Sequence, residues 1–146
     1  MEVYSIGFTQ TDAARFFGRL KAAGIRRLVD VRLNNTSQLA GWAKRADLPY
    51  FLRELAGADY HHEPLFAPTQ TILDAYKKNK GDWSEYERAF VALLDARRVA
   101  ETVPQELLLS VPTVLLCSEA TAEQCHRRLV LEYLEARWKN FSVRHL

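Results

Sequence analysis

The chain has 146 residues and a formal net charge of +2; 48% of its residues are hydrophobic and 26% are charged. These values favour a single folded domain over residues 1–146 and give little support for nucleic-acid binding, which usually needs a basic surplus. No apolar run approaches the roughly 18 residues of a membrane span, and the N-terminus lacks the basic start of a signal peptide. We therefore expect a cytoplasmic protein with no membrane partner.

The first 31 residues have the pattern of a strand–helix–strand unit. Residues 3–7 and 27–31 are short apolar stretches that we expect to form strands. Between them, a helix capped by Thr9 or Thr11 should end near Gly24. Its buried face should carry four apolar residues at helical spacing: Ala13, Phe16, Phe17 and Leu20. Such a unit implies that the two strands pair in parallel.

Residues 33–46 show neither helical nor strand periodicity and are rich in polar side chains. A loop of this length within a compact domain is often functional. After it, Asp47 should cap a helix that Gly57 ends, and a short strand should follow over residues 59–62. The inward face of this helix should consist of Leu48, Phe51, Leu52 and Leu55.

The second half of the chain begins with two expected helices, over residues 69–78 and 83–99, separated by a break at Gly81. Residues 111–116 then read VPTVLL. A continuous apolar run of this length is typical of a strand that is buried on both faces, as in the middle of a parallel sheet.

A capping box over residues 121–124 predicts the start of the last helix, with Thr121 as N-cap and Gln124 at the third helical position. This helix should run to about Trp138 and be followed by a strand over residues 141–145. Its inward face should consist of Leu129, Val130, Tyr133 and Leu134. Together the elements predict an α/β fold, a three-layer α/β/α sandwich with a mainly parallel sheet of about five strands.

Polar and reactive residues follow each predicted strand. In open parallel sheets, ligands bind beyond the carboxyl ends of the strands, which meet at one edge. The residues at these positions are Thr9, Asp30, Arg32, Asn35, Ser37, His61, His62, Glu63, Cys117, Glu119, Cys125, His126, Arg127 and His145. We therefore expect one ligand site at this edge of the sheet.

Cys117 is the first candidate for chemistry, because it ends the buried strand just before a helix N-terminus. The positive partial charge of a helix N-terminus favours anions and can lower the pKa of a thiol. His126 and Arg127 would add to this effect, and Glu119 could act as a general acid or base or orient His126. We predict Cys117, Glu119 and His126 as catalytic residues. The alternative is that Cys117 is a small buried hydrophobic residue.

Cys125 lies four residues before Leu129 and should pack in the core, with a role as resolving thiol for Cys117 as the alternative. We predict no metal or cofactor. Seven residues separate the cysteines, whereas about two to four are usual in zinc knuckles, and adjacent Cys125 and His126 should point in different directions around a helix. Metal binding by Cys117, Cys125 and His126, with His145, remains an alternative.

Asp30 and Arg32 are two residues apart on a strand and therefore share one of its faces. Arg32 could hold an anion while Asp30 holds Arg32, or the two could form a buried salt bridge. The residues that we predict to bind the ligand are Thr9, Asp30, Arg32, Asn35, Ser37 and Arg127.

Five stretches of the chain together resemble the family called domain of unknown function 488. They are YSIGFT at residues 4–9, VDVRLNNTSQLAG at 29–41, YHHEPLFAPT at 60–69, LLCSEATAEQCHRRL at 115–129 and VRHL at 143–146. The resemblance implies an α/β fold and no particular reaction. It also implies a shared polar site made of Asp30, Arg32, Cys117, Glu119, Cys125, His126 and Arg127.

The chain is more loosely similar to rhodanese-like sulfurtransferases, which also place Asp-Val-Arg after a strand and a nucleophilic cysteine at a strand end. It departs from them directly after Cys117, where Ser118 and Glu119 replace their Gly- and Arg-containing cradle. The charge of Glu119 would oppose an anionic sulfur donor, so the likeness does not predict sulfur transfer.

The sequence therefore predicts a domain that binds a small anionic or phosphorylated ligand. Cys117 would be the nucleophile or redox centre, His126 and Glu119 would handle protons, and Arg32 and Arg127 would hold the anion. One alternative is a nucleic-acid-binding or processing module that uses loop residues Asn34, Asn35, Gln38, Trp42 and Lys44. Another is a metal or redox sensor built on the two cysteines, and a purely structural or partner-binding domain is a third.

Overall fold

The computed structural model of the chain describes all residues except 37–39, so Ser37 and Gln38 lie outside the described residues. Its centre is a sheet of five parallel strands in the order β3-β2-β4-β1-β5. The strands are β1 (Glu2–Gly7), β2 (Arg27–Asp30), β3 (Asp59–His62), β4 (Thr113–Cys117) and β5 (Ser142–His145). The predicted α/β class with about five strands is confirmed, and their carboxyl ends share one edge.

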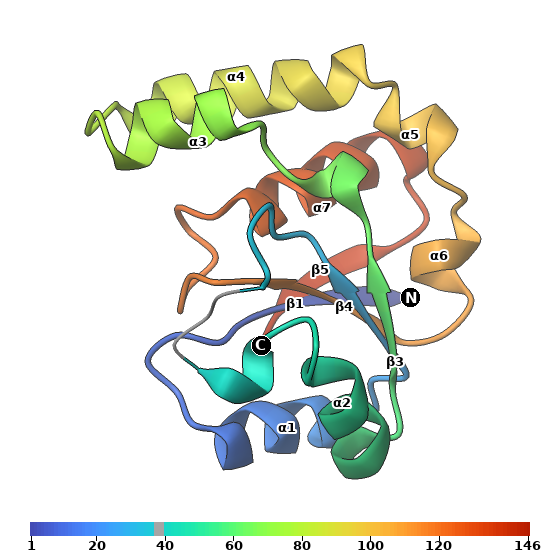
Figure 1. The fold of residues 1–146 in the computed structure, drawn as a ribbon. Helices are drawn as coiled ribbons and strands as arrows, with labels where there is room; N and C mark the ends of the chain where they lie inside the picture. Colours follow the sequence, from blue (N-terminus) through green and yellow to red (C-terminus); the bar gives the residue numbers. More distant parts are fainter. Residues whose placement is uncertain (37–39) are drawn as a thin grey trace.

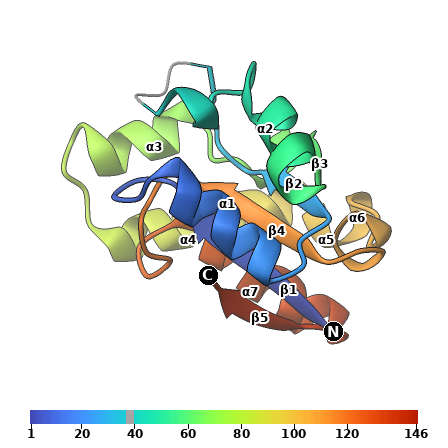
Figure 2. The same cartoon turned by 90° about the horizontal axis from the view of Figure 1, so that it is seen from below.

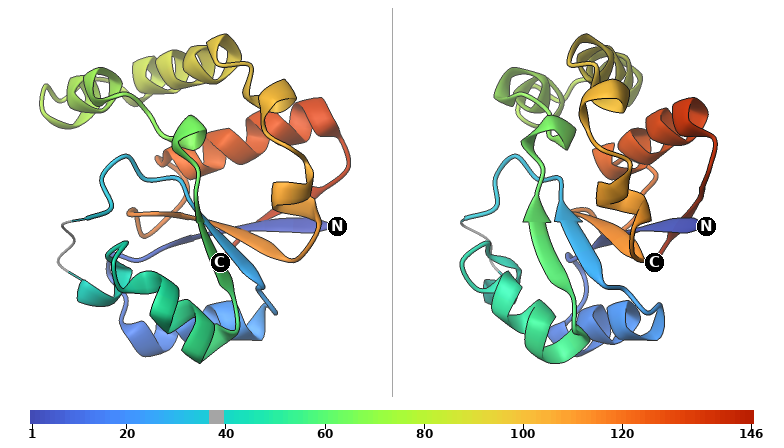
Figure 3. Two further views of the ribbon diagram at one scale, coloured as in Figure 1. Left: turned by 45° about the vertical axis from the view of Figure 1, so that its right-hand side comes forward. Right: turned by 90° about the vertical axis from the view of Figure 1, so that its right-hand side faces the viewer.

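Helices cover both faces of the sheet and complete the three predicted layers (Figures 1 and 3). On one face lie α1 (Ala13–Ala22), the short 3-10 helix η1 (Gly41–Ala43) and α2 (Leu48–Ala56), and Figure 2 shows this face. The opposite face carries η2 (Pro64–Phe66), α3 (Gln70–Lys77), α4 (Trp83–Ala96), α5 (Val99–Thr102), α6 (Glu106–Leu109) and α7 (His126–Trp138).

The central strand β4 contributes to two separate apolar cores. Leu115 packs into the core beneath α4 and α7, whereas Val114 and Leu116 pack into the core beneath α1 and α2. All three side chains are fully buried. The continuous apolar run in the sequence therefore marks a strand buried on both faces, as predicted.

Local differences from the predicted elements have simple physical reasons. Asp12, and not Thr9 or Thr11, caps α1, because its carboxylate accepts the Arg15 N–H at 2.8 Å. Leu55 was expected to face inward but is 49% exposed. The long predicted helix stops at Ala96, since Arg98 adopts a left-handed φ of 54° before α5 begins.

The main correction concerns the start of α7. Its first residue is His126, so the residues of the predicted capping box around Thr121 lie before the helix. Cys125 is the N-cap, and its backbone is extended with φ −138° and ψ 138°. The helix ends at Trp138 and buries Leu129, Val130, Tyr133 and Leu134, as predicted.

Within residues 1–36 and 40–146, every helix is too short or too polar to cross a bilayer.

Candidate functional site

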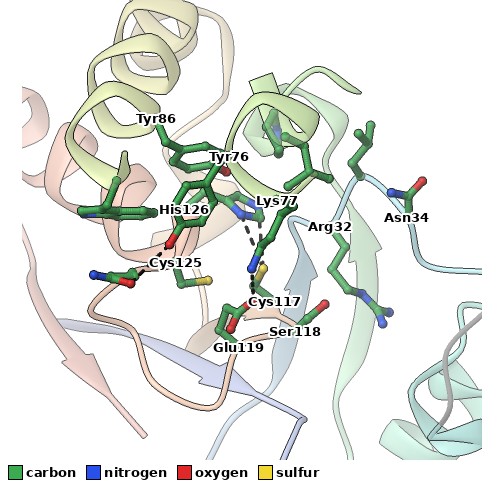
Figure 4. A pocket seen from close by; sticks show the side chains of 15 residues that line it. Arg32, Asn34, Tyr76, Lys77, Tyr86, Cys117, Ser118, Glu119, Cys125 and His126 are labelled. Atoms are coloured by element: carbon green, nitrogen blue, oxygen red, sulfur yellow. Dashed lines mark hydrogen bonds and ion pairs between the residues drawn. The ribbon is translucent and has the colours of Figure 1, made fainter. Parts of the chain in front are cut away.

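A cavity of about 220 Å³ opens at the carboxyl end of β4, between the start of α7 and the helices α3 and α4. Its floor and one wall carry Cys117, Ser118, Glu119, Cys125 and His126 (Figure 4). Side chains from α3 and α4 form the opposite wall: Tyr76, Lys77, Trp83 and Tyr86. The three residues predicted to be catalytic, Cys117, Glu119 and His126, thus line one cavity.

The side chains of Cys117 and His126 form a close pair on this wall. The Sγ atom of Cys117 lies 3.5 Å from Nδ1 of His126 and 3.9 Å from Nε2. Nε2 is 2.7 Å from the backbone carbonyl oxygen of Val31. Because a carbonyl only accepts, Nε2 must carry the hydrogen, and the unprotonated Nδ1 is the ring nitrogen nearer to Cys117. Nδ1 is therefore the nitrogen available to take the thiol proton, once the Cys117 side chain turns from the face of the ring toward its edge.

The surroundings of the two cysteines separate their pKa values. A hydrogen bond from the Cys125 thiol lowers the pKa of Cys117, and burial opposes this. The backbone amides of Ser118 and Glu119 and the charge of Arg127 reinforce the lowering. The pKa of Cys125 is raised, first by its hydrogen bond to Cys117 and then by burial. Cys117 is thus the more acidic thiol of the pair and the one more readily converted to a thiolate.

Lys77 supplies a cation at the cavity that the sequence reasoning missed. Its Nζ atom lies 2.8 Å from Oε1 of Glu119, and both side chains are about half exposed. Burial lowers the pKa of Lys77, but the hydrogen bond and charge of Glu119 outweigh it and raise the pKa overall. In the sequence Lys77 is one of several nearby lysines on a predicted helix, a pattern typical of a solvated face. Only the contact with Glu119, 42 residues away, distinguishes it.

Arg127 and Thr9 lie under the cavity and hold its loop. Arg127 is 1% exposed and donates to the Glu119 carbonyl oxygen at 2.7 Å and to Ser5 Oγ at 3.1 Å. Thr9 Oγ1 donates to the Ser118 carbonyl oxygen at 2.8 Å. Neither side chain lines the cavity. Both therefore act on a ligand only through residues 118 and 119.

Arg32 lines the cavity, but its guanidinium forms a buried ion pair with Asp30 that lies apart from Cys117. Nε and Nη2 of Arg32 each donate to one carboxylate oxygen of Asp30 at 2.9 Å. Tyr60 and Asn35 donate to the same carboxylate at 2.6 and 3.3 Å. Figure 4 shows the Arg32 side chain directed away from Cys117. Its guanidinium lies 5.2 Å from the centre of the Phe8 ring, in the core beneath α1 and α2.

Other candidates are spread over the molecule. Trp42 packs against Phe16, with ring centres 4.8 Å apart, so it belongs to the core. His61 pairs with Glu63 at 3.3 Å on the surface side of β3. Nδ1 of His145 shares a hydrogen bond with the hydroxyl of Ser5 on β1. None of these side chains lines the cavity.

Cys117, Cys125 and His126 converge on one point, contrary to the expected divergence of Cys125 and His126. One ligand atom from each residue lies within 4.8 Å of the others, and all three residues are buried. The expectation assumed that both residues lie within a helix. Because Cys125 precedes the helix in an extended conformation, its side chain can turn toward the same side as the ring of His126.

Comparison with known proteins gives one family. The model described as "Domain of unknown function DUF488" matches residues 12–134, which is most of the chain and includes every cavity residue. No curated protein and no solved structure matches the chain.

Proposed function

The chain belongs to the family described as domain of unknown function DUF488, and we propose that its cavity binds a small anionic ligand. Cys117 would meet this ligand as a nucleophilic thiolate. The carrying observation is the orientation of His126. Its unprotonated Nδ1 lies 3.5 Å from Cys117 Sγ, while the Val31 carbonyl fixes the other ring nitrogen at 2.7 Å. A nucleophile, a base and a group that orients the base are the recurring parts of thiol catalysis.

The chemical roles follow from this geometry. His126 takes the proton of Cys117, and the thiolate attacks an electrophilic atom of the ligand. As the new bond to sulfur forms, the bond to the leaving group breaks, and His126 returns the proton to that group. The backbone amides of Ser118 and Glu119, which point at the Cys117 sulfur, favour negative charge there.

Lys77 is the cation best placed to meet the charge of the ligand. It lines the cavity beside Cys117 and Glu119 (Figure 4). A carboxylate or phosphate of the ligand would replace Glu119 as the partner of the Lys77 ammonium. Glu119 would then be free for proton transfer. Arg127 and Thr9 would support the site by holding residues 118 and 119. Asp30, Arg32 and Asn35 would support it by fixing the end of β2.

The test compares two alkylating reagents that differ in charge, neutral iodoacetamide and anionic iodoacetate, at one neutral pH. Mass spectrometry follows Cys117 and Cys125 separately. We expect Cys117 to react faster than Cys125. At Cys117, the ratio of the iodoacetate rate to the iodoacetamide rate should be higher in the folded protein than in an unfolded peptide that contains Cys117. His126→Ala should slow both reagents at Cys117 by as much as about 100-fold.

Lys77→Ala separates anion binding from thiol reactivity. It should lower the iodoacetate rate by about two- to fivefold, the effect of one partly exposed charge, and leave iodoacetamide unchanged. Lys78→Ala is the matched control, since Lys78 is the neighbouring residue but is 74% exposed and absent from the cavity wall. Equal loss in both variants, or a Cys117 that reacts only on unfolding, would contradict the proposal.

The proposal places the protein in the cytoplasm, where reducing conditions keep both cysteines as free thiols. The nucleic-acid alternative loses support, because Asn35 is bound to Asp30 and Trp42 packs in the core. Salt-sensitive binding of an oligonucleotide would restore it.

A further inference from the structure

We propose that Cys117, Cys125 and His126 form a binding site for a thiophilic divalent cation, with Zn²⁺ as the ion that fits, and that its fourth coordination position faces the cavity. The three ligand atoms already lie within 4.8 Å of one another. Two thiolates and one imidazole are a set that zinc accepts.

The distance between two of the ligand atoms matches a tetrahedral site. Zinc binds sulfur at about 2.3 Å and imidazole nitrogen at about 2.0–2.1 Å, which at a tetrahedral angle separates the two ligands by about 3.5 Å. Cys117 Sγ and His126 Nδ1 are 3.5 Å apart. The sulfur of Cys125 is the third ligand atom. Because Cys117 Sγ also lies 3.9 Å from Nε2, it sits beside the face of the ring, and a rotation of the Cys117 side chain would bring the sulfur and the Nδ1 lone pair to a single ion.

The orientation of His126 also suits a metal ligand. Ligating histidines usually donate their other ring N–H to a carboxylate or backbone carbonyl, which fixes the tautomer and the ring plane. Here Nε2 donates to the Val31 carbonyl at 2.7 Å, so Nδ1 is the nitrogen left for a metal.

A positive charge beside the cluster would help a bound ion to deprotonate the second cysteine. Nη1 of Arg127 donates to Cys125 Sγ at 3.5 Å and would stabilise the thiolate that a bound ion creates there. Two thiolates balance a divalent ion, and both thiol protons leave on binding. Because all three residues line the cavity, the fourth position is open to water or an anion, as in catalytic rather than closed structural zinc sites.

Metal binding would regulate the proposed thiol chemistry. Only this regulatory effect, and not the metal site itself, rests on the proposed function. A Cys117 sulfur that is bound to zinc cannot attack an electrophile. Zinc and the electrophilic ligand would therefore exclude each other. Cys125 separates the two roles, because it would bind the metal directly but affects nucleophilic attack only through its hydrogen bond to Cys117.

The test uses Zn²⁺ and Co²⁺ with the full, reduced protein. We expect one ion per chain by calorimetry and elemental analysis. The Co²⁺ complex should show a thiolate-to-cobalt charge-transfer band and the intense visible bands of tetrahedral cobalt. Zn²⁺ should protect both cysteines from iodoacetamide, and a chelator should restore their reactivity. Cys125→Ser should weaken binding by more than the roughly 10- to 100-fold that loss of an outer-shell partner costs.

His61→Ala is the control for binding at any surface histidine and should leave the affinity unchanged, because His61 lies outside the cluster. Absence of the charge-transfer band in the wild-type protein, or equal Co²⁺ binding by the Cys125→Ser and wild-type proteins, would overturn the inference. The wild-type spectrum decides the matter even if a variant does not fold. A reactive Cys117 without zinc binding leaves the proposed function intact, whereas zinc binding with an inert metal-free Cys117 removes the function and keeps the metal site.

Discussion

At the residue scale, Gly7 leaves the room that the cavity loop occupies. A Cβ atom on Gly7 would lie 1.6 Å from the carbonyl oxygen and 2.6 Å from the carbonyl carbon of Glu119, and 3.2 Å from Nη1 of Arg127. Backbone atoms cannot yield as a flexible side chain can. The loop that follows Cys117 would therefore have to move.

We expect Gly7→Ala to reduce the free energy of unfolding by about 1–3 kcal/mol, the usual effect of overpacking, and to slow alkylation of Cys117. Gly18→Ala is the matched control. Gly18 lies exposed within α1 with no atom near its Cβ position, so this change should stabilise the protein by about 0.5–1 kcal/mol. Urea unfolding measures both, and equal stabilities of the two variants would count against this account of Gly7.

Asp30 is the residue on which the buried polar network beneath α1 and α2 depends. Its carboxylate is fully buried and accepts from Arg32, Tyr60 and Asn35. Asp30→Asn leaves the charge of Arg32 buried without its partner, which typically costs about 3–5 kcal/mol. Asp59→Asn, at an exposed carboxylate on β3, should change the stability little. A loss below about 1 kcal/mol for Asp30→Asn would mean that water reaches the pair.

The same pair predicts a pH dependence. Burial raises the pKa of Asp30, but the hydrogen bonds and charge of Arg32 outweigh it and hold the pKa below its ordinary value of 3.8. The stabilisation is therefore fully present at neutral pH. It is lost as the pH falls below the pKa of Asp30 in the unfolded chain and then through its pKa in the folded protein, because the unfolded chain binds the proton more readily. The stability difference between wild type and Asp30→Asn, from urea unfolding at several pH values, should shrink below about pH 4.

At the scale of elements, the start of α7 decides how the cysteines meet. If the helix began at Thr121, Cys125 and His126 would both lie within it and point apart. The start at His126 lets them converge. We expect Thr121→Ala to change the stability by less than about 0.5 kcal/mol, because Thr121 caps nothing. Asp12→Ala removes the observed cap of α1 and should cost about 0.5–2 kcal/mol in urea unfolding. A larger loss of stability for Thr121→Ala than for Asp12→Ala would show instead that Thr121 caps a helix.

Apolar periodicity was sufficient to predict the strands and most helix faces. The apolar residues of β4, and those at helical spacing in α1 and α7, are the residues that these elements bury. It could not predict contacts that the chain makes across long distances. Lys77 reaches Glu119 from 42 residues away, and the Val31 carbonyl orients His126 from 95 residues away. Arg32 follows β2 and lines the cavity, yet its guanidinium is directed to Asp30 and to the core beneath α1.

At the scale of the whole molecule, Val31 links the two faces of the sheet. Its N–H donates to the Leu116 carbonyl at 3.1 Å, and its own carbonyl accepts from His126. Asp30 and Arg32, the residues before and after Val31, form their ion pair on the other face of the sheet. The buried network therefore fixes the backbone that orients His126, which gives the network a positioning role although only Arg32 of the ion pair lines the cavity.

This arrangement predicts a gradient of stability across the sheet. β4 is paired on both sides and all five of its residues are buried, whereas β5 pairs only with β1 and is mostly exposed. Amide hydrogen exchange under native conditions should therefore be slowest in β4 and approach the rate set by global unfolding there, and should be fastest among the strands in β5 and β3, which open locally. Equal protection of β5 and β4 would show that the sheet opens only as a unit. The Cys117 end of β4 would then owe its rigidity to global stability, and Asp30→Asn would accelerate exchange in every strand alike.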